Sequence, residues 1–157
     1  MATDMTVVTE FLSGRFIAAV ATQNPDGSAH VVPIWYLFEN GAIYLPTNLG
    51  SVKARNVKER PYASVMIDSR GPGSLRAAST KGSAELLDEV VAKEINHRCW
   101  SKYCTSAGMA DPDVGGLLAS YDTVCIKIVP TRWIWSDMGP IFKGKLENPS
   151  LVLPYSP

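Results

Sequence analysis

The segment of residues 42–68 constrains the fold most, because two short apolar runs flank a basic stretch with helical character. The runs Ala42–Thr47 and Tyr62–Asp68 are rich in Ile, Val, Tyr and Met, which is typical of buried β-strands. Between them, Ser51 suits a helix N-cap. Arg60-Pro61 predicts the helix end, since proline disfavours the helical conformation of the residue before it. We therefore expect a strand, a polar turn, a short basic helix and a second strand.

The polar turn before this helix carries groups that an organic phosphate needs. Thr47 and Ser51 supply hydroxyls, and Lys53 and Arg55 follow within the next four positions. Free N–H groups at a helix N-terminus, together with hydroxyls and cations, bind phosphate. The alternative is a solvated basic helix that merely joins two strands, and the spacing alone does not decide between the two.

Composition and charge narrow the class of protein. A chain of 157 residues is most simply one domain with a core of its own. Its 15 basic and 15 acidic residues cancel to a net charge of +0, which disfavours a nucleic-acid binder. Three cysteines without CxxC spacing indicate a reducing compartment. With no signal peptide and no run of about 18 apolar residues, we expect a cytoplasmic protein that does not enter membranes.

The N-terminal third predicts a helix followed by an antiparallel meander. The turn signals Asn24-Pro25-Asp26-Gly27 and Asn40-Gly41 separate the apolar runs from one another. We expect three consecutive strands with short connections. The expected elements are a helix at 4–12 and strands at 15–22, 29–39 and Ala42–Thr47.

Pro33 interrupts the second of these strands. Because proline has no N–H for the ladder, it belongs on an edge strand, at a bulge, or where strand pairing opens. One interpretation is a plain edge strand. The other is that residues 32–35 leave the ladder and turn backbone N–H and C=O groups toward a flat heterocycle.

The remaining chain predicts more strands, one long helix and a tail. Gly82 in the next strand indicates that another backbone or a ligand passes close by. His97, Cys99 and Cys104 lack a fourth ligand, so we expect no metal site. A single domain at 1–138 would precede a tail at 139–157, whose four prolines predict an extended segment or one packed on a partner subunit. The expected elements are strands at 75–87, 123–129 and 132–135, helices at 88–103 and 113–121, and a loop at 105–112.

These elements predict a mainly β fold, a six-stranded antiparallel barrel with flanking helices. Their order resembles that of the pyridoxamine 5′-phosphate oxidase-like, flavin-binding split-barrel family, over residues 7–136. The residues that carry the resemblance are 18–21, 26–27, 31–35, 44–47, 51–57, 60–61, 63–68 and 81–86.

The resemblance implies a homodimer with two FMN sites at its interface. Lys53 would hold the phosphate with help from Ser51 and from Arg55 or Asn56, and Thr47 would contact the ribityl chain or the ring edge. The ring itself would lie against backbone groups of Val32, Pro33, Ile34 and Trp35. Either Trp133 or Trp135 would close the pocket, although tryptophans on one face of a strand are also typical of a core.

The sequence departs from true pyridoxamine-phosphate oxidases, which argues against vitamin B6 oxidation. The strand AHVVPIWY carries only His30 where that family has a basic pair, and the tail is not basic. No nucleophile–base pair stands out, so no catalytic residue is predicted. Three hypotheses remain: an FMN-dependent oxidoreductase that moves a hydride between NAD(P)H and a small flat substrate, a reductase that uses an 8-hydroxy-5-deazaflavin coenzyme, and a non-catalytic binder of flavin, haem or tetrapyrrole.

Overall fold

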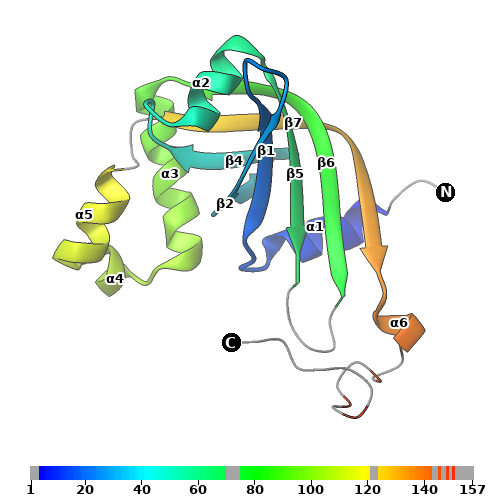
Figure 1. Ribbon diagram of the computed structural model, residues 1–157. Helices are drawn as coiled ribbons and strands as arrows, with labels where there is room; N and C mark the ends of the chain where they lie inside the picture. The colour runs from blue at the N-terminus through cyan, green and yellow to red at the C-terminus, as the bar shows by residue number, and fades with distance from the viewer. Residues whose placement is uncertain are drawn as a thin grey trace.

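A curled antiparallel sheet dominates the computed structural model, which describes residues 4–69, 75–120 and 124–142 together with 145, 148 and 150 (Figure 1). Within these residues, seven strands form one sheet in the order β2-β1-β5-β6-β7-β4-β3. The predicted mainly β architecture is therefore confirmed. The strands are β1 (Ala18–Gln23), β2 (Ala29–Ile34), β3 (Leu37–Glu39), β4 (Ala42–Thr47), β5 (Tyr62–Asp68), β6 (Arg76–Leu87) and β7 (Val124–Asp137).

The two outermost strands of the sheet, β2 and β3, are consecutive in the chain. Only Trp35 and Tyr36 separate them, so the sheet must curl until its opposite edges approach each other. We call this junction, residues 34–37, the seam. The curled sheet is an antiparallel split barrel, as predicted, with seven strands in place of six. The expected continuous strand at 29–39 is wrong, because the chain leaves the ladder at the seam.

The antiparallel pairing predicted for the three-stranded meander is confirmed, but its second strand is divided into β2 and β3. β2 pairs with β1 alone, whereas β4 pairs with β3 and with β7. The hairpin turn between β3 and β4 is confirmed, since Asn40 and Gly41 both have positive φ angles, of 50° and 76°. The first and second hairpins therefore lie at opposite edges of the sheet, and the seam connects them.

The core fills the inside of the curled sheet. Alternate residues of the strands point inward, among them Val20, Leu45, Ile67 and Ile128, and all four are fully buried. α1 packs Val8, Phe11 and Leu12 against this cluster. Its start is fixed by the Asp4 carboxylate, which accepts a hydrogen bond from the Thr6 N–H at 2.9 Å. The predicted N-terminal helix is thus confirmed.

Helices lie at the ends and on one side of the barrel (Figure 1). The helices expected at 88–103 and 113–121 are confirmed as α3 and α5. The loop expected at 105–112 is wrong, because the Thr105 hydroxyl accepts a hydrogen bond from the Gly108 N–H at 3.1 Å and starts α4 there. The helices are α1 (Met5–Ser13), α2 (Val52–Glu59), α3 (Glu89–Tyr103), α4 (Ser106–Ala110), α5 (Pro112–Ser120) and α6 (Gly139–Phe142).

The C-terminal tail is described only in part. α6 begins it, and beyond residue 142 only residues 145, 148 and 150 are described, so the prediction for an extended or partner-bound tail falls mostly outside them. Of the described helices, none is both long enough and apolar enough to span a membrane.

β7 is one continuous strand, so the two short strands expected around Pro130 are wrong. The ladder with β6 shifts register there, because Lys81 pairs with Arg132 while Gly82 pairs with Pro130. The extra residue, Thr131, forms a bulge and donates its hydroxyl to the Lys81 carbonyl at 2.8 Å. A Cβ atom on Gly82 would overlap the Val129 carbonyl, so the predicted close approach at Gly82 is confirmed as one of backbone on backbone.

We predict that Gly82→Ala lowers the free energy of unfolding by about 1–3 kcal/mol, because the new methyl group meets backbone that cannot move aside. The matched control is Gly116→Ala in α5, where a Cβ atom has nothing within 4 Å. That change should stabilise the protein by about 0.5–1 kcal/mol through helix propensity. Urea denaturation measures both, and an equal effect of the two substitutions would contradict the close approach.

Candidate functional site

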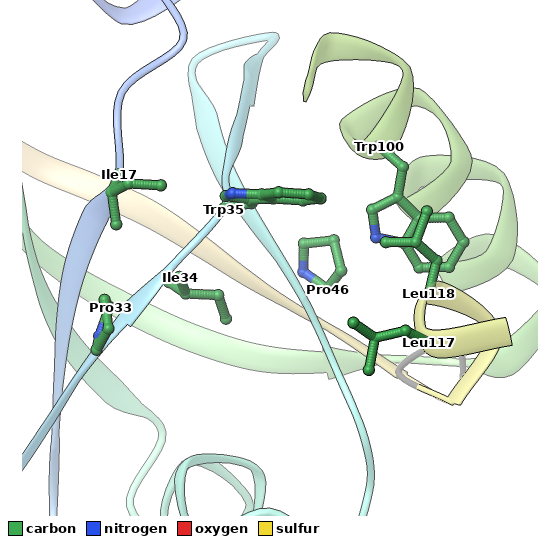
Figure 2. Close-up of a pocket in the computed structure, with 8 residues that line it drawn as sticks. All are labelled: Ile17, Pro33, Ile34, Trp35, Pro46, Trp100, Leu117 and Leu118. Carbon is green, nitrogen blue, oxygen red and sulfur yellow. The ribbon is translucent and has the colours of Figure 1, made fainter. Parts of the chain in front are cut away.

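An apolar cavity of about 320 Å³ lies beside the seam (Figure 2). This volume is at the small end of the range for ligand sites, about 300–1,000 Å³. All of the lining residues are uncharged and apolar in character. They are Ile17, Pro33, Ile34, Trp35, Pro46, Trp100, Leu117 and Leu118.

Three of the four residues predicted to face a ring line this cavity, namely Pro33, Ile34 and Trp35. The fourth, Val32, packs against the barrel core instead. The edge-strand interpretation of Pro33 is confirmed, because β2 pairs with β1 on one side and ends the sheet on the other. An edge strand also carries backbone groups outside the ladder, so contact between this edge and a ligand stays a prediction.

Trp35 is held in place by an aromatic stack with α3. Its ring lies parallel to that of Tyr103, with centroids 4.8 Å apart and 5° between the planes. The Tyr103 hydroxyl donates to the Phe16 carbonyl at 2.7 Å and accepts from the Tyr36 N–H at 3.4 Å. Burial raises the pKa of Tyr103, which keeps this hydroxyl protonated as a donor. One face of the Trp35 indole is thereby covered, and the other is left to line the cavity.

Tyr36 and Lys102 fix the seam to the end of α1. The Tyr36 hydroxyl donates to the Leu12 carbonyl at 3.0 Å, and the Lys102 amine donates to the same oxygen at 3.0 Å. The Lys102 amine also lies 3.8 Å from the centroid of the Tyr36 ring. Burial lowers the pKa of Lys102 to about 8. The two donors satisfy the Leu12 carbonyl at the end of α1, and they hold Tyr36, and with it the seam, against that helix.

The other side of the cavity comes from helices that sequence reasoning did not connect to the site. Trp100 lies on α3, and Leu117 and Leu118 lie on α5. The signal was a pair of adjacent leucines in a segment otherwise rich in Gly and polar residues, but it does not specify what they pack against. Ile17 and Pro46, from the neighbourhood of β1 and from β4, were also missed.

The polar turn before α2 begins one residue after the cavity-lining Pro46. We call residues 47–53 the α2 turn. Ser51 is the N-cap of α2, and its hydroxyl accepts from the Ala54 N–H at 3.2 Å. The Thr47 hydroxyl lies 3.2 Å from that of Ser51. Thr47 is 0% exposed, so it supports Ser51 from inside the protein.

The two cations predicted for a phosphate both follow this N-cap. Lys53 is partly exposed and Arg55 is exposed, and in the described part of the chain neither has an ion-pair partner. Burial lowers the pKa of Lys53, because the charged amine loses solvent without gaining a carboxylate. An anion bound at the α2 turn would offset this loss.

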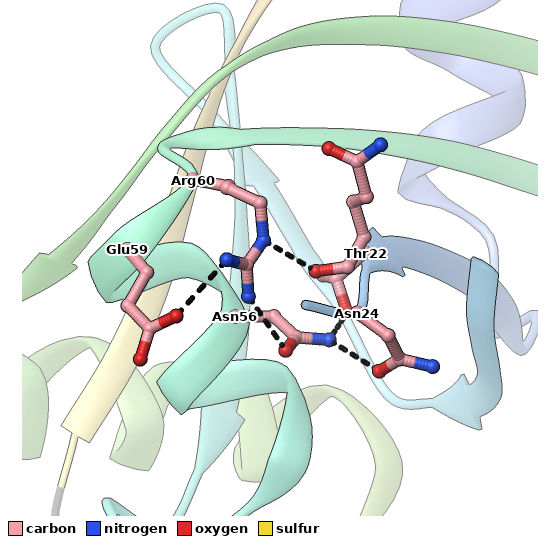
Figure 3. A network of polar contacts seen from close by, with 6 residues as sticks. Thr22, Asn24, Asn56, Glu59 and Arg60 are labelled. Atoms are coloured by element: carbon pink, nitrogen blue, oxygen red, sulfur yellow. Dashed lines mark hydrogen bonds and ion pairs between the residues drawn. The ribbon is translucent and has the colours of Figure 1, made fainter. Parts of the chain in front are cut away.

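Asn56, which was also predicted to assist at the phosphate, takes part in a network of hydrogen bonds within the protein (Figure 3). Its amide nitrogen donates to the Thr22 hydroxyl at 3.1 Å and to the Asn24 side-chain oxygen at 3.0 Å, and its own oxygen accepts from Arg60 at 3.4 Å. Arg60 also donates to the Gln23 carbonyl at 2.8 Å. The network attaches α2 to the end of β1 and so fixes the position of the α2 turn.

The two tryptophans of β7 pack in or against the core, and neither lines the apolar cavity. Trp133 is 6% exposed and meets Phe38 edge-on, with centroids 5.8 Å apart. Trp135 is partly buried and meets Phe11 at 5.0 Å. The core interpretation therefore describes Trp133 in this chain. Closure of the cofactor pocket by Trp135 stays a prediction.

Two of the three cysteines, Cys99 and Cys125, are buried free thiols. Burial raises the pKa of both Cys99 and Cys125 to about 12, so these thiols are neutral. His97 lies exposed on α3. Across residues 4–69, 75–120 and 124–142, no three potential metal ligands come together.

Comparison with known proteins adds a family-level match. Residues 6–132 match the family model described as Pyridoxamine 5'-phosphate oxidase. Among curated proteins, no sequence matches this chain significantly.

Several solved structures share the fold. The conserved hypothetical protein Rv2991 from Mycobacterium tuberculosis is 26% identical, with a TM-score of 0.71 over 87% of this chain and 86% of that chain. An F420 reductase is 19% identical, with a TM-score of 0.61 over 80% and 94%. A FAD-binding protein (mll6688) from Mesorhizobium loti is 22% identical, with a TM-score of 0.64 over 86% and 95%.

Proposed function

Because this chain belongs to the pyridoxamine 5′-phosphate oxidase family, we propose that it is an oxidoreductase using a phosphate-bearing flavin or deazaflavin. The observation that carries the proposal is the adjacency of two different sites. Pro46 lines the apolar cavity, and the α2 turn follows it directly along the chain. Its Lys53 has no ion-pair partner within the described part of the chain. A cofactor with a flat ring and a phosphate on a short chain requires this combination.

The α2 turn fits the phosphate end of such a cofactor. The first N–H groups of α2 and the Ser51 hydroxyl would donate to phosphate oxygens, and the Lys53 amine would neutralise their charge. Each charge-assisted hydrogen bond of this kind contributes about 1.5–3 kcal/mol. Arg55 would add a second cation from the exposed side, while Thr47 and Asn56 act as positioning residues.

The strand side of the cavity fits the ring end. Backbone groups along the β2 edge at Pro33, Ile34 and Trp35 would bond the polar rim of the ring, and Pro46 would contact its face. When bound, the cofactor supplies hydride transfer. The protein's part is to hold the ring in one orientation and to keep water from it with apolar walls.

We propose a class of cofactor, flavin or deazaflavin, because the related structures include proteins of both kinds. One is an F420 reductase and another is FAD-binding, and both share only the fold with this chain. FMN is our first choice, and an 8-hydroxy-5-deazaflavin coenzyme is the alternative. The uncharged cavity also argues against pyridoxamine phosphate as the substrate, since nothing in the lining would pair with its charges.

We further propose a homodimer formed through the outer face of the sheet. Val31, Met66 and Ile134 are exposed there on β2, β5 and β7, and together they line a second hollow of about 520 Å³. Lys81 and Arg132 lie beside them on β6 and β7. Exposed apolar side chains gathered on one face and rimmed by charge are typical of a protein interface.

The cofactor site is tested by Lys53→Ala, with Lys58→Ala at the exposed far end of α2 as the matched control. We expect Lys53→Ala to weaken FMN binding about ten- to a hundredfold, because one charge-assisted contact is lost. Lys58→Ala should bind FMN as the wild type does. Fluorescence titration with FMN, repeated with the deazaflavin, measures this. If both variants lose FMN affinity equally, or if neither loses any, the assignment of Lys53 to the phosphate site is contradicted.

The dimer is tested by light scattering on the purified protein. The wild type should show about twice the chain mass of 17.0 kDa. Ile134→Glu should shift the protein toward monomer, because a carboxylate would be buried in the apolar interface. Val129→Glu is the matched control, an exposed apolar position on the same strand but outside this hollow. A monomeric wild type would contradict the proposal.

A further inference from the structure

The apolar cavity has a helix wall that the proposed cofactor does not explain. Trp100, Leu117 and Leu118 form it, opposite the strand wall of Pro33, Ile34 and Pro46 (Figure 2). The strand wall continues into the α2 turn, where the phosphate is proposed to bind. The helix wall is therefore the side of the cavity that faces away from the cofactor's own anchoring groups.

The two leucines of α5 play different structural parts. Leu118 is 9% exposed and is the one buried residue of α5, and it lines the cavity together with Trp100 of α3. Leu117 lines the same cavity but is 60% exposed, so it lies at the rim. A molecule that enters between the two walls would cover Leu117 and remove its apolar surface from water.

The helix wall is a single side-chain layer. Behind it lies another cavity, of about 420 Å³, among α3, α4 and α5, and both Trp100 and Leu118 line that cavity too. A wall with space on both sides can shift slightly to fit guests of different thickness. This side of the cavity is therefore suited to the reversible binding of a small molecule.

The lining chemistry restricts what that molecule can be. None of the eight lining side chains carries a charge, and the indole N–H groups of Trp35 and Trp100 are the only polar side-chain atoms among them. A charged group moved from water into such surroundings loses its solvation without a partner. The covered Trp35 ring presents one flat face, which favours a planar guest.

We propose that the helix wall is an acceptor subsite for uncharged, planar, largely apolar ring compounds, and that Leu117 is its specificity-determining residue. This inference rests on the proposed function, since it names the class of molecule that would meet the cofactor. Hydride transfer needs reacting atoms about 3–3.5 Å apart, so a flat ring between the two walls has the required shape.

The experiment uses cofactor-loaded protein and two matched probes. The first is 2,3-dimethyl-1,4-naphthoquinone, whose doubly substituted quinone ring cannot add the Cys104 thiol. The second carries a carboxymethyl group in place of one methyl group and so has a negative charge. Isothermal titration calorimetry measures both probes against the wild type, Leu117→Glu and Val114→Glu, with and without FMN. Val114 is an exposed apolar residue of α5 outside the cavity lining, which makes it the control.

We expect the neutral quinone to bind the wild type at least tenfold more tightly than the charged one. Leu117→Glu should weaken neutral binding at least tenfold, while Val114→Glu changes it less than twofold. Equal binding of the two quinones, no effect of Leu117→Glu, or competition between FMN and the quinone for one space would overturn the subsite. FMN affinity is read in its own titration, so loss of FMN binding with these quinone preferences intact would refute the proposed function and still support the subsite.

Discussion

The stack of Trp35 on Tyr103 is the interaction on which the arrangement of the site depends. It holds the chain at the point where β2 leaves the sheet, and the next residue, Tyr36, sends its hydroxyl to the end of α1. This junction connects β2 and β3, the two edge strands, so its conformation brings the opposite edges of the sheet together. The barrel stays open on the side where β2 ends, and the apolar cavity occupies that opening.

The α2 turn complements this cavity through a different kind of interaction. Its hydroxyls and free N–H groups are local features of a helix start, but their position is set from a distance by the network of Asn56 with Thr22 and Asn24. Lys53 has been partly withdrawn from water without a carboxylate nearby in the described structure, which costs stability unless an anion binds.

The parts of the structure that the sequence predicts are those governed by neighbours along the chain. Ser51 as an N-cap and Asn40-Gly41 as a hairpin turn follow from local geometry, and both are observed. Pro33 raises the alternative that residues 32–35 leave the ladder, but the local sequence does not decide between that and a plain edge strand. The break itself lies at Trp35-Tyr36, where the run from Ala29 to Glu39 has no turn residue. It depends on Tyr103, which lies on another element far along the chain.

The same reasoning explains which site residues were missed and which predicted residues kept two possible roles. Leu117 and Leu118 belong to a short helix whose partner surface cannot be deduced from its own sequence, and Asn56 has the side chain of a ligand contact but the surroundings of a structural residue. Trp133 fits both a lid and a core until the inward face of β7 is known. In each case a long-range contact decides the role.

The most direct test of the account is anaerobic reduction of the cofactor-loaded protein, followed by absorbance. We expect NADH or NADPH to bleach bound FMN, and an uncharged quinone to restore its absorbance, within times compatible with turnover. Reduction of the quinone by the deazaflavin form alone would assign the alternative cofactor within the same account. A tightly bound cofactor that neither accepts nor donates a hydride under these conditions would contradict the assignment of this protein as an oxidoreductase.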